Sequence, residues 1–449
     1  MKTTLKIETI CALATAIGQS GIGVVRVSGP LSKVISKKIL QKELKPRHAF
    51  YGAFYDNEDN TIDKGVAIYF PGPNSYTGED VVEFQGHGGM SVMRKILEIA
   101  LFLGARLSEP GEFSKRAFLN GKMDLVQAEA VQDLIQSSSE ESALSAVRSL
   151  TGEFSDKINH LLLELTSLRV FVEATIDFSD EEIDFLESHQ VSTKLKNLKD
   201  LLKNILESAN QGAILRDGLH VAIAGKPNAG KSSLLNALTK QPSAIVTDIA
   251  GTTRDVLKET IHVDGMPLHI IDTAGLHNSD DIIEQEGIKR AYTEINNADV
   301  VLLVFDTKDD VPDFSILPDL VKNKPIICIR NKIDLSNTES KVNKLGTQLE
   351  VSLSAKNGDG VDLLRKTLAE FAGLNSDGEG VFLARKRHID SIDQTLIYIN
   401  SALEQLEGGA SELVAEDLRQ AGMSLGQITG EFSSDDLLGE IFSSFCIGK

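Results

Sequence analysis

Short apolar runs alternate with turn residues along the first part of the chain. The runs GIGVVRVSG, AFYGAFYD, KGVAIYF and DVVEFQG are punctuated by Gly, Pro and Asn, as β-strands usually are. The run SVMRKILEIALFLGA, which follows them, has helical spacing. Residues 1–120 are therefore expected to form an N-terminal α+β domain.

A different pattern begins after residue 120. In LLLELTSLRVFVEATI and TKLKNLKDLLKNILESA the apolar residues recur every three or four positions, as in amphipathic helices. The same spacing returns over residues 379–449. Between these stretches, GLHVAIAG, MPLHIIDTAG, DVVLLVFD and KPIICIRNKID are apolar strands that alternate with helices, which is typical of a parallel sheet. The pattern predicts an α/β domain at 216–378, inserted between two parts of a helical-bundle domain at 121–215 and 379–449.

Composition narrows the class of protein. The chain has 449 residues, of which 41% are hydrophobic, and this is ordinary for a globular protein with several cores. No apolar run approaches the roughly 20 residues of a membrane span, and the N-terminus lacks the features of an export signal. Cys11, Cys328 and Cys446 lie far apart and form no CxxC pair. Their spacing argues against a zinc site or a disulfide framework and favours a cytoplasmic location.

The net charge of −19 argues at first against a nucleic-acid partner. The acidic excess, however, falls mainly on the two stretches with helical spacing, where a solvated helix surface explains it. Residues 1–120 carry 15 basic and 12 acidic side chains. A nucleic-acid partner would have to use this part of the chain or a local basic cluster such as Arg385-Lys386-Arg387.

A phosphate-binding motif follows the strand LHVAIA. Residues 225–232 read GKPNAGKS, which fits G-x-x-x-x-G-K-[ST], and the run SSLLNALTK then opens a helix, as the motif requires. Glycines let backbone N–H groups approach phosphate oxygens, and the helix N-terminus adds positive potential. Lys231 would neutralise the β- and γ-phosphates, and the Ser232 hydroxyl could bind Mg²⁺. Taken alone, the motif could also be a glycine-rich turn with a chance lysine.

Three further motifs occur in the order of a guanine-nucleotide-binding domain. DTAG at 272–275 ends a strand and places the Asp272 carboxylate near the expected Mg²⁺. NKID at 331–334 ends another, and Asp334 could accept both N–H groups of guanine, whereas adenine presents an acceptor there. The segment Ser354-Ala355-Lys356 completes a base-binding loop. All four motifs follow strands, at the edge where open α/β sheets bind ligands. The sequence therefore predicts a Ras-like P-loop GTPase domain.

The residue that usually positions the attacking water is missing. Small GTPases have a glutamine directly after DTAG, whereas this chain has Leu276. Arg254 and Arg290 could act as arginine fingers, although nothing in the pattern singles them out. Thr253, in the polar segment 246–255, is a candidate second Mg²⁺ ligand. Glu284 is a candidate for positioning water, and the simpler alternative is a solvated acid at a helix start.

The chain ends in CIGK, an unusual place for one of three cysteines. A prenylation box needs two aliphatic residues after its cysteine and then Ser, Met, Gln, Ala, Leu or Phe, but Gly448 and Lys449 stand in the last two places. A lipid anchor is therefore a poor interpretation. Either the tail has no role, or a flexible arm delivers the thiol of Cys446 to another part of the protein.

Over its whole length the chain resembles the MnmE family of tRNA-modifying GTPases, also called TrmE. The resemblance rests on ETICALATAIGQSGIGVVRVSG near the start, GEFSKRAFLNGKMDLVQAEAV at 111–131, GKPNAGKSSLLNAL and TDIAGTTRDV in the GTPase domain, and the terminal CIGK. The GTPase motifs alone would fit many proteins. Their combination with both flanking regions and the tail is specific.

The resemblance implies an architecture and a reaction. The family has a folate-binding, dimerising N-terminal domain, a helical domain in two segments and an inserted G domain. It forms a cytoplasmic homodimer without membrane attachment, which joins the flavoprotein MnmG (GidA) in a heterotetramer or larger complex. Together they add an aminomethyl or carboxymethylaminomethyl group to C5 of the wobble uridine of certain tRNAs. The methylene carbon comes from 5-formyl- or methylene-tetrahydrofolate.

The resemblance also implies a folate site. Arg26, Glu83, Lys122 and Lys449 match the folate-binding positions of the family, and Cys446 would lie near the one-carbon unit as a catalytic residue. These residue types suit a folate, because the polar edges of a pterin can bind a carboxylate and the negatively charged glutamate tail of the folate attracts cations. Without the resemblance, the first three would be interpreted as ordinary surface charge.

For the G domain the resemblance implies hydrolysis that depends on potassium and on pairing of two G domains. Glu284 matches the catalytic glutamate, and a potassium ion could offset transition-state charge in place of an arginine finger. The implied K⁺ ligands are Asn228, Thr247, Ile249 and Thr252, and the Mg²⁺ ligands are Ser232 and Thr253. The expected GTP-binding residues are Asn228, Ala229, Gly230, Lys231, Ser232, Ser233, Thr247, Asp248, Ile249, Ala250, Gly251, Thr252, Thr253, Asp272, Thr273, Ala274, Gly275, Asn331, Lys332, Asp334, Ser354, Ala355 and Lys356.

One alternative from another class is a regulatory GTPase that binds ribosomal RNA during ribosome assembly. Such proteins share the G-domain motifs but usually append an RNA-binding module, and no GXXG loop in a KH-like setting follows residue 378. The N-terminal domain and the tail favour tRNA modification instead.

Overall fold

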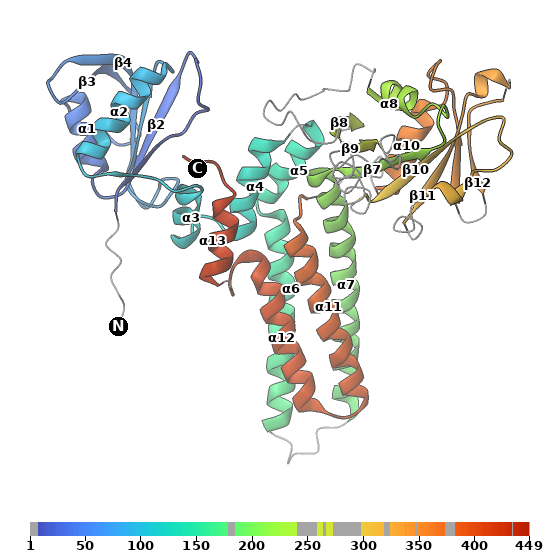
Figure 1. Ribbon diagram of the computed structural model, residues 1–449. Helices are drawn as coiled ribbons and strands as arrows, with labels where there is room; N and C mark the ends of the chain where they lie inside the picture. The colour runs from blue at the N-terminus through green and yellow to red at the C-terminus, as the bar shows by residue number, and fades with distance from the viewer. Residues whose placement is uncertain are drawn as a thin grey trace, which may run out of the picture. The chain divides into compact units, whose positions relative to one another are not determined.

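The computed structural model describes most of the chain. The described residues are 8–137, 139–177, 185–239, 258–263, 266–272, 298–317, 324–336, 338–345, 348–372, 382–432 and 434–448. The chain divides into two compact units, shown as ribbons in Figure 1. The first comprises Met1–Ile135, Ser149–Val191 and Tyr398–Lys449, and the second comprises Gln136–Arg148 and Ser192–Ile397. Helices α7 (Phe185–Asp217) and α11 (Lys386–Glu407) contribute residues to both units.

A six-stranded sheet forms the N-terminal part of the first unit. Its strands lie in the order β3 (Phe50–Tyr55), β4 (Thr61–Phe70), β5 (Val81–Gly86), β2 (Gly23–Ser28), β1 (Ile10–Leu13) and β6 (Arg106–Leu107). Neighbouring strands are antiparallel except β1 and β6. Helices α1 (Ser32–Leu40) and α2 (Met90–Phe102) cover one face of the sheet (Figure 1).

The two faces of this sheet bury different side chains. Because successive residues of a strand point to opposite faces, Cys11 joins the core under α1 and α2, whereas Ile10 and Ala12 pack with Phe113 on the other side. Phe113 belongs to α3 (Glu112–Leu119), so α3 packs on the second face. On β2 the same alternation places Val25 in the first core. Its neighbour Arg26 therefore points toward the face that holds α3.

The helical part of the first unit joins two distant stretches of sequence. Helix α6 (Glu153–Asp177) packs along α12 (Ser411–Thr429). Each carries a buried apolar stripe at three- and four-residue spacing. The stripes are Leu161, Leu165, Leu168 and Val172 on α6, and Val414, Leu418, Ala421, Leu425 and Ile428 on α12. The predicted helical bundle in two segments is therefore confirmed.

A seven-stranded sheet forms the centre of the second unit. Its order is β12 (Lys341–Leu345), β13 (Gln348–Ser352), β11 (Ile326–Asn331), β10 (Val300–Asp306), β7 (Leu219–Gly225), β9 (Met266–Asp272) and β8 (Lys258–Val263). The five central strands are parallel, and the edge strands β8 and β12 are antiparallel to their neighbours. This is the parallel sheet that the apolar runs predicted.

The central strand β10 shows why its sequence is apolar throughout. Val300, Leu302 and Val304 belong to one core, whereas Val301, Leu303 and Phe305 belong to another. A strand buried on both faces needs apolar residues at every position rather than at alternate ones. The first core also receives α8 (Lys231–Thr239) and α10 (Val361–Phe371). The predicted multidomain α/β fold class is thus confirmed.

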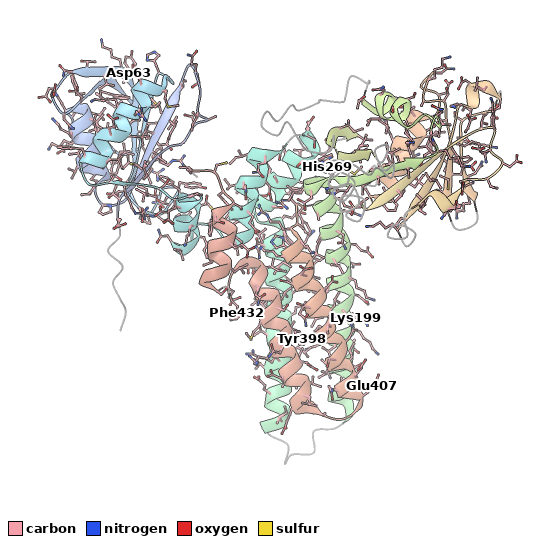
Figure 2. All side chains as sticks on the ribbon, in the orientation of Figure 1. Asp63, Lys199, His269, Tyr398, Glu407 and Phe432 are labelled. Carbon is pink, nitrogen blue, oxygen red and sulfur yellow. The ribbon has the colours of Figure 1, made fainter. Side chains whose placement is uncertain are left out.

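The junction between α7 and the second sheet is fixed by a side chain. His269 on β9, labelled in Figure 2, donates from Nε2 to the carbonyl oxygen of Asp217, the last residue of α7, at 2.9 Å. The sheet therefore begins directly at the end of the long helix.

Helix α5 (Glu140–Leu150) precedes α6 in the chain. Among the described residues, no helix combines the length and the apolar character of a membrane span.

Candidate functional site

The phosphate-binding motif lies between β7 and α8. Strand β7 ends at Gly225 and α8 begins at Lys231, as the sequence predicts. Gly230 has φ +98°, and a Cβ at this position would lie 2.2 Å from Asn331 Nδ2, so the close approach requires glycine. Lys231 Nζ donates to the carbonyl oxygens of Gly225 at 2.8 Å and Lys226 at 3.1 Å. These bonds hold the ammonium group over the loop.

The side chain of Asn331 ties three of the predicted motifs together. It is 2% exposed, and its Nδ2 donates to the carbonyl oxygen of Ala229 in the phosphate loop at 2.9 Å. Its Oδ1 accepts from the backbone N–H of Lys332 at 2.8 Å and of Ala355 at 3.0 Å. The structure thus brings the GKPNAGKS, NKID and Ser354-Ala355-Lys356 segments to one place, which is called the nucleotide pocket from here on.

Asp334 is oriented within this pocket by a serine. Ser354 is fully buried and donates from Oγ to Asp334 Oδ1 at 2.7 Å. The same Oγ accepts from the backbone N–H of Asn357 at 3.3 Å. With one carboxylate oxygen held in this way, Asp334 can present the other to a ligand. A carboxylate fixed at the end of a strand suits recognition of paired N–H donors such as those of guanine.

Several predicted residues lie outside the described part of the chain. Strand β9 ends at Asp272, whose backbone pairs with Ile223 of β7, and the structure describes no side chain there. The predicted residues outside the described ranges are Thr247, Asp248, Ile249, Ala250, Gly251, Thr252, Thr253, Thr273, Ala274, Gly275, Glu284 and Lys449. The candidate arginines Arg254 and Arg290 and the position of Leu276 lie there too. Their roles stay predictions.

A second polar site lies on the α3 face of the N-terminal sheet. Arg26 on β2 stands directly opposite Glu83 on β5, and Arg26 Nε donates to Glu83 Oε1 at 2.9 Å. The guanidinium carbon lies 5.2 Å from the centroid of the Tyr76 ring and 5.7 Å from that of Phe113. Arg26 Nη1 also donates to the carbonyl oxygen of Gly448 at 3.4 Å. These five residues are called the Arg26 site.

The tail reaches this site through a packed helix. Helix α13 (Asp435–Ser443) and the residues after it bury Phe442 and Phe445 against Leu125 and Ala128 of α4 (Leu125–Gln136). Gln132, also on α4, donates from Nε2 to the Ser444 carbonyl oxygen at 2.8 Å. The sequence left two possibilities open, a tail without a role or a flexible arm. Aromatic burial instead fixes the tail up to the residue before Cys446.

The last described residues fit closely against β1. The N–H of Gly111 donates to the carbonyl oxygen of Cys446 at 3.4 Å, and the Cys446 side chain is exposed. Gly448 has φ +93°, and a Cβ there would lie 2.4 Å from the carbonyl oxygen of Leu13. Only glycine fits this contact without a backbone shift. The end of the tail therefore packs in one specific position, next to Arg26.

Lys122 follows α3, and its side chain lies against the loop that leads into β5. Its backbone N–H donates to the Ala117 carbonyl oxygen at 2.8 Å, at the end of α3. Its side-chain carbons Cγ and Cδ pass 3.4 Å from the position that a Cβ of Gly78 would take. Of the four predicted folate-binding residues, the structure pairs Arg26 with Glu83 and places Lys122 at the end of the helix whose Phe113 packs near Arg26.

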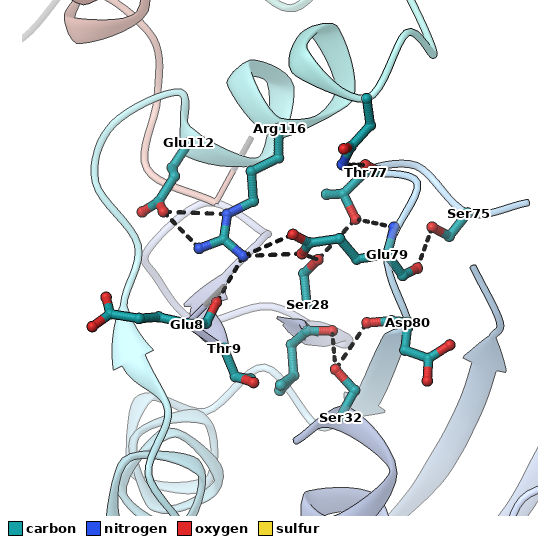
Figure 3. A network of polar contacts seen from close by, with 12 residues as sticks. Glu8, Thr9, Ser28, Ser32, Ser75, Thr77, Glu79, Asp80, Glu112 and Arg116 are labelled. Carbon is teal, nitrogen blue, oxygen red and sulfur yellow. Dashed lines mark hydrogen bonds and ion pairs between the residues drawn. The ribbon is translucent and has the colours of Figure 1, made fainter. Parts of the chain in front are cut away.

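Sequence reasoning missed an ionic network under α3 (Figure 3). Arg116 binds Glu79 at 2.9 Å and Glu112 at 2.9 Å, and all three side chains are at most 13% exposed. Ser28 Oγ donates to Glu79 Oε2 at 2.6 Å. Arg106 adds a second pair to Glu112 at 2.6 Å. The four-residue spacing of Glu112 and Arg116 was the available signal, but such pairs usually lie on solvated helix faces.

This network keeps its carboxylates charged. Burial raises the pKa of Glu112, but hydrogen bonds from Arg106, from the backbone N–H of Glu109 and from Arg116 outweigh it and lower the pKa to about 2. The buried charges are therefore paired with cations and hydrogen-bonded, which is the condition for a stable buried ion pair. The network fixes α3, and with it Phe113 and Gly111, against the sheet.

Comparison with known proteins gives matches along nearly the entire chain. Residues 9–122 match the family model described as the GTP-binding protein TrmE N-terminus, and residues 125–446 match the model of the MnmE helical domain. The tRNA modification GTPase MnmE of Ruthia magnifica subsp. Calyptogena magnifica is 63% identical over 98% of this chain and 99% of its own length. The protein of the same name from Ectopseudomonas mendocina (strain ymp) is 54% identical over 98% and 99%.

Solved structures match a smaller part of the chain. The G domain of the T. maritima FeoB iron transporter is 28% identical, covers 34% of this chain and 98% of its own, and has a TM-score of 0.26. Era from Aquifex aeolicus, solved with GDP and AlF4−, is 26% identical, covers 40% of this chain and 66% of its own, and has a TM-score of 0.26.

Proposed function

The chain belongs to the MnmE family of tRNA modification GTPases, and we propose a separate role for the Arg26 site and for the nucleotide pocket. It is a GTP-hydrolysing enzyme of tRNA modification. We propose that the modification is the addition of an aminomethyl or carboxymethylaminomethyl group at C5 of the wobble uridine. One observation supports this assignment most strongly: the tail is seated beside Arg26, where the donor of the one-carbon unit would bind.

The Arg26 site has the chemistry that a reduced folate requires. Glu83 can accept N–H groups from a pterin edge, and the rings of Tyr76 and Phe113 offer flat apolar surfaces next to the Arg26 guanidinium. Lys122, with Lys449, would attract the glutamate carboxylates. A bound 5-formyl- or methylene-tetrahydrofolate would supply the one-carbon unit. Cys446 is exposed beside this site, so its thiol is available to act on that unit or to shape its surroundings.

In the nucleotide pocket the chain's own residues divide the recognition of GTP. Asp334, oriented by Ser354, would bind the guanine N–H groups, and Lys231 would leave the carbonyls of Gly225 and Lys226 to contact the β- and γ-phosphates. Ser232 and Thr253 would hold Mg²⁺, which neutralises phosphate charge when bound.

Potassium-stimulated hydrolysis is part of the same proposal. Asn228, which has φ +64° in the phosphate loop, is the described member of the proposed K⁺ ligand set, with Thr247, Ile249 and Thr252. Glu284 would position the attacking water in place of the missing glutamine. Pairing of two G domains in a homodimer would complete the site.

The proposed partners are a second copy of this chain, the flavoprotein MnmG (GidA) in a heterotetramer or larger complex, and tRNA. The proposed location is the cytoplasm. These partners are supported by the similarity to relatives named tRNA modification GTPase, which extends over 99% of the length of each relative. The surfaces through which those relatives bind their partners can therefore be present in this chain too.

The modification can be tested by nucleoside mass spectrometry of tRNA from cells that lack this protein. We expect C5-aminomethylated or carboxymethylaminomethylated wobble uridine to be absent and to return when the gene is restored. An unchanged nucleoside profile would contradict the assignment.

The ion can be tested separately with the purified protein. GTP hydrolysis should be faster in potassium than in sodium at equal ionic strength, because the size of the ion sets the fit of its ligand shell. Equal rates in the two salts would remove potassium from the mechanism.

A further inference from the structure

An acidic loop follows the central strand of the second sheet. Residues 306–313, read DTKDDVPD, begin at Asp306, the last residue of β10, and end at Asp313, which caps the short helix η1 (Phe314–Ile316). Asp306 stands opposite Asn331 in the register of β10 and β11. An acidic loop next to a pocket for a polyanion is electrostatically unfavourable, and this calls for an explanation.

Basic side chains from the pocket motifs and from β11 contact this loop. Lys332, the second residue of NKID, binds Asp306 with an Nζ–Oδ2 distance of 2.7 Å. Lys226, the second residue of the phosphate motif, binds Asp313 at 3.2 Å. Arg330 donates to the backbone carbonyls of Asp309 at 3.0 Å and Asp310 at 3.3 Å. The loop is therefore attached to both the base side and the phosphate side of the nucleotide pocket.

The contact between Asp306 and Lys332 is the tighter of the two ion pairs. The two side chains are 22% and 31% exposed, whereas those of Asp313 and Lys226 are 38% and 51% exposed. Asp306 Oδ1 also accepts from the backbone N–H of Lys308 at 3.1 Å, so its carboxylate has a fixed orientation. The hydrogen bond from Lys332 lowers the pKa of Asp306, which keeps the carboxylate ionised.

The backbone of Lys332 has an uncommon conformation. Its φ of +68° lies in the left-handed region, which is unusual for a lysine, and it stands between Asn331 and the 3₁₀ turn that carries Asp334. Without a partner, a lysine side chain at this position would sample many rotamers, and its ammonium group would have no fixed place. With the ammonium group held by Asp306, the methylene stem follows one path beside the pocket and can cover an aromatic face.

We propose that Asp306 is a positioning residue for the guanine base: it holds Lys332 so that the lysine stem forms one wall of the base site. This inference rests on guanine-nucleotide binding by the pocket. Asp306 acts through Lys332 and does not touch the nucleotide. The attachment of Lys226 to Asp313 is the weaker, more exposed counterpart on the phosphate side.

The proposal predicts an effect opposite in sign to simple electrostatics. Removing a negative charge near a site for a polyanion should tighten binding if only the long-range field matters. If Asp306 positions Lys332, Asp306→Asn should instead weaken it. Because the wall contacts the base, GDP and GTP should lose affinity by the same factor, about tenfold for the loss of a charged hydrogen bond.

The experiment is a titration of the full-length protein with fluorescent GDP and with a non-hydrolysable GTP analogue. Asp306→Asn is compared with Asp310→Asn, which removes the same charge from the same loop but leaves intact the backbone contact that Asp310 makes to Arg330. We expect the first variant to bind both nucleotides about tenfold more weakly and the second to bind them as well as the wild type or better. Asp306→Glu should recover part of the loss.

A double-mutant cycle protects the test against a general loss of structure. In a Lys332→Gln background, adding Asp306→Asn should change the affinity no further, because the partner that it positions is gone. Equal affinities of Asp306→Asn and Asp310→Asn, or additive losses in the cycle, would overturn the proposal. If the wild-type protein did not bind guanine nucleotides at all, the proposed function would fail, and this inference, which rests on it, would fail with it.

Discussion

The Arg26 site and the nucleotide pocket differ in how far along the sequence their contacts reach. Arg26 and Gly448 are 422 positions apart, and Gln132 and Ser444, which seat the tail, are 312 apart. In the nucleotide pocket Ser354 contacts Asp334 over 20 positions, and Asn331 reaches Ala355 over 24 and Ala229 over 102. The pocket is thus built from motifs at the ends of parallel strands of one sheet, whereas the Arg26 site depends on the packing of α13.

The difference shows which sites tolerate independent change. Strand ends of a parallel sheet meet at one edge whatever the rest of the chain does, so the pocket is a property of the sheet. The Arg26 site exists only if aromatic burial under Phe442 and Phe445 holds the tail in place. We therefore expect changes in the tail to affect modification and to leave nucleotide hydrolysis intact.

Deleting residues 446–449 should have the largest effect. Modification of the wobble uridine in cells should be lost, because the Gly448 carbonyl that accepts from Arg26 and the exposed Cys446 thiol would both be removed. GTP hydrolysis by the purified variant should be unchanged. Nucleoside mass spectrometry and a phosphate-release assay measure the two effects. An intact modification profile would show that the two sites do not divide the work in this way.

Asp334→Asn should produce the converse effect. Its amide can still accept from Ser354 but cannot accept both guanine N–H groups, so GTP affinity should fall about 100-fold or more. Xanthosine triphosphate should gain, because its base offers an acceptor to the amide N–H. Competition binding between the two nucleotides measures the change. Unaltered preference for GTP would contradict the assignment of Asp334.

Gly448→Ala sharpens the comparison at a single atom. The added Cβ would meet the Leu13 carbonyl oxygen at 2.4 Å, and the positive φ costs about 1–3 kcal/mol for alanine. We expect the modification rate to fall about tenfold, with hydrolysis unchanged. Gly439→Ala in α13 is the matched control, because its Cβ would meet nothing within 4 Å. If both variants modified tRNA equally well, the close seat of Gly448 would have no role.

The smallest effect on modification and on hydrolysis is expected from the ionic network under α3. The folded-state pKa of Glu112 is about 2, below the ordinary value of 4.5. Its contribution to stability, about 3 kcal/mol at most, is therefore complete above pH 4.5 and is lost as the pH falls toward 2. Thermal melting of the wild type and Glu112→Gln should differ most at pH 6 and converge in acid. A difference that stays constant with pH would exclude this titration.

Residues with a recurring local context could be predicted from the sequence. The run GKPNAGKS lies between a strand and a helix, and the NKID motif ends β11, because apolar strand patterns are visible in one sequence. The helical pattern likewise predicted α6 and α12. Which helix faces would meet could not be predicted, since an apolar stripe does not name its partner.

The remaining residues of the two sites could be placed only with the three-dimensional structure. Arg26 and Glu83 gained their roles from family resemblance, and only the register of β2 and β5 shows that they face each other. Glu79 and Arg116 resemble surface charge in the sequence, and their burial depends on the packing of α3. Asp306 follows an apolar strand like many other acids, and no motif connects it to Lys332. Long-range packing carries no local signature.

The span of 422 residues between Arg26 and Gly448 also has a consequence in time. A ribosome adds roughly 5–20 residues per second, so about 20–80 s separate the synthesis of the two residues. The N-terminal sheet can fold in a small fraction of that interval. In each round of synthesis the sheet can therefore be folded, with Arg26 on its surface, before the tail that contacts Arg26 has been made. A small molecule that binds Glu83 and Arg26 could therefore bind the nascent protein before the C-terminal residues of the chain contact Arg26.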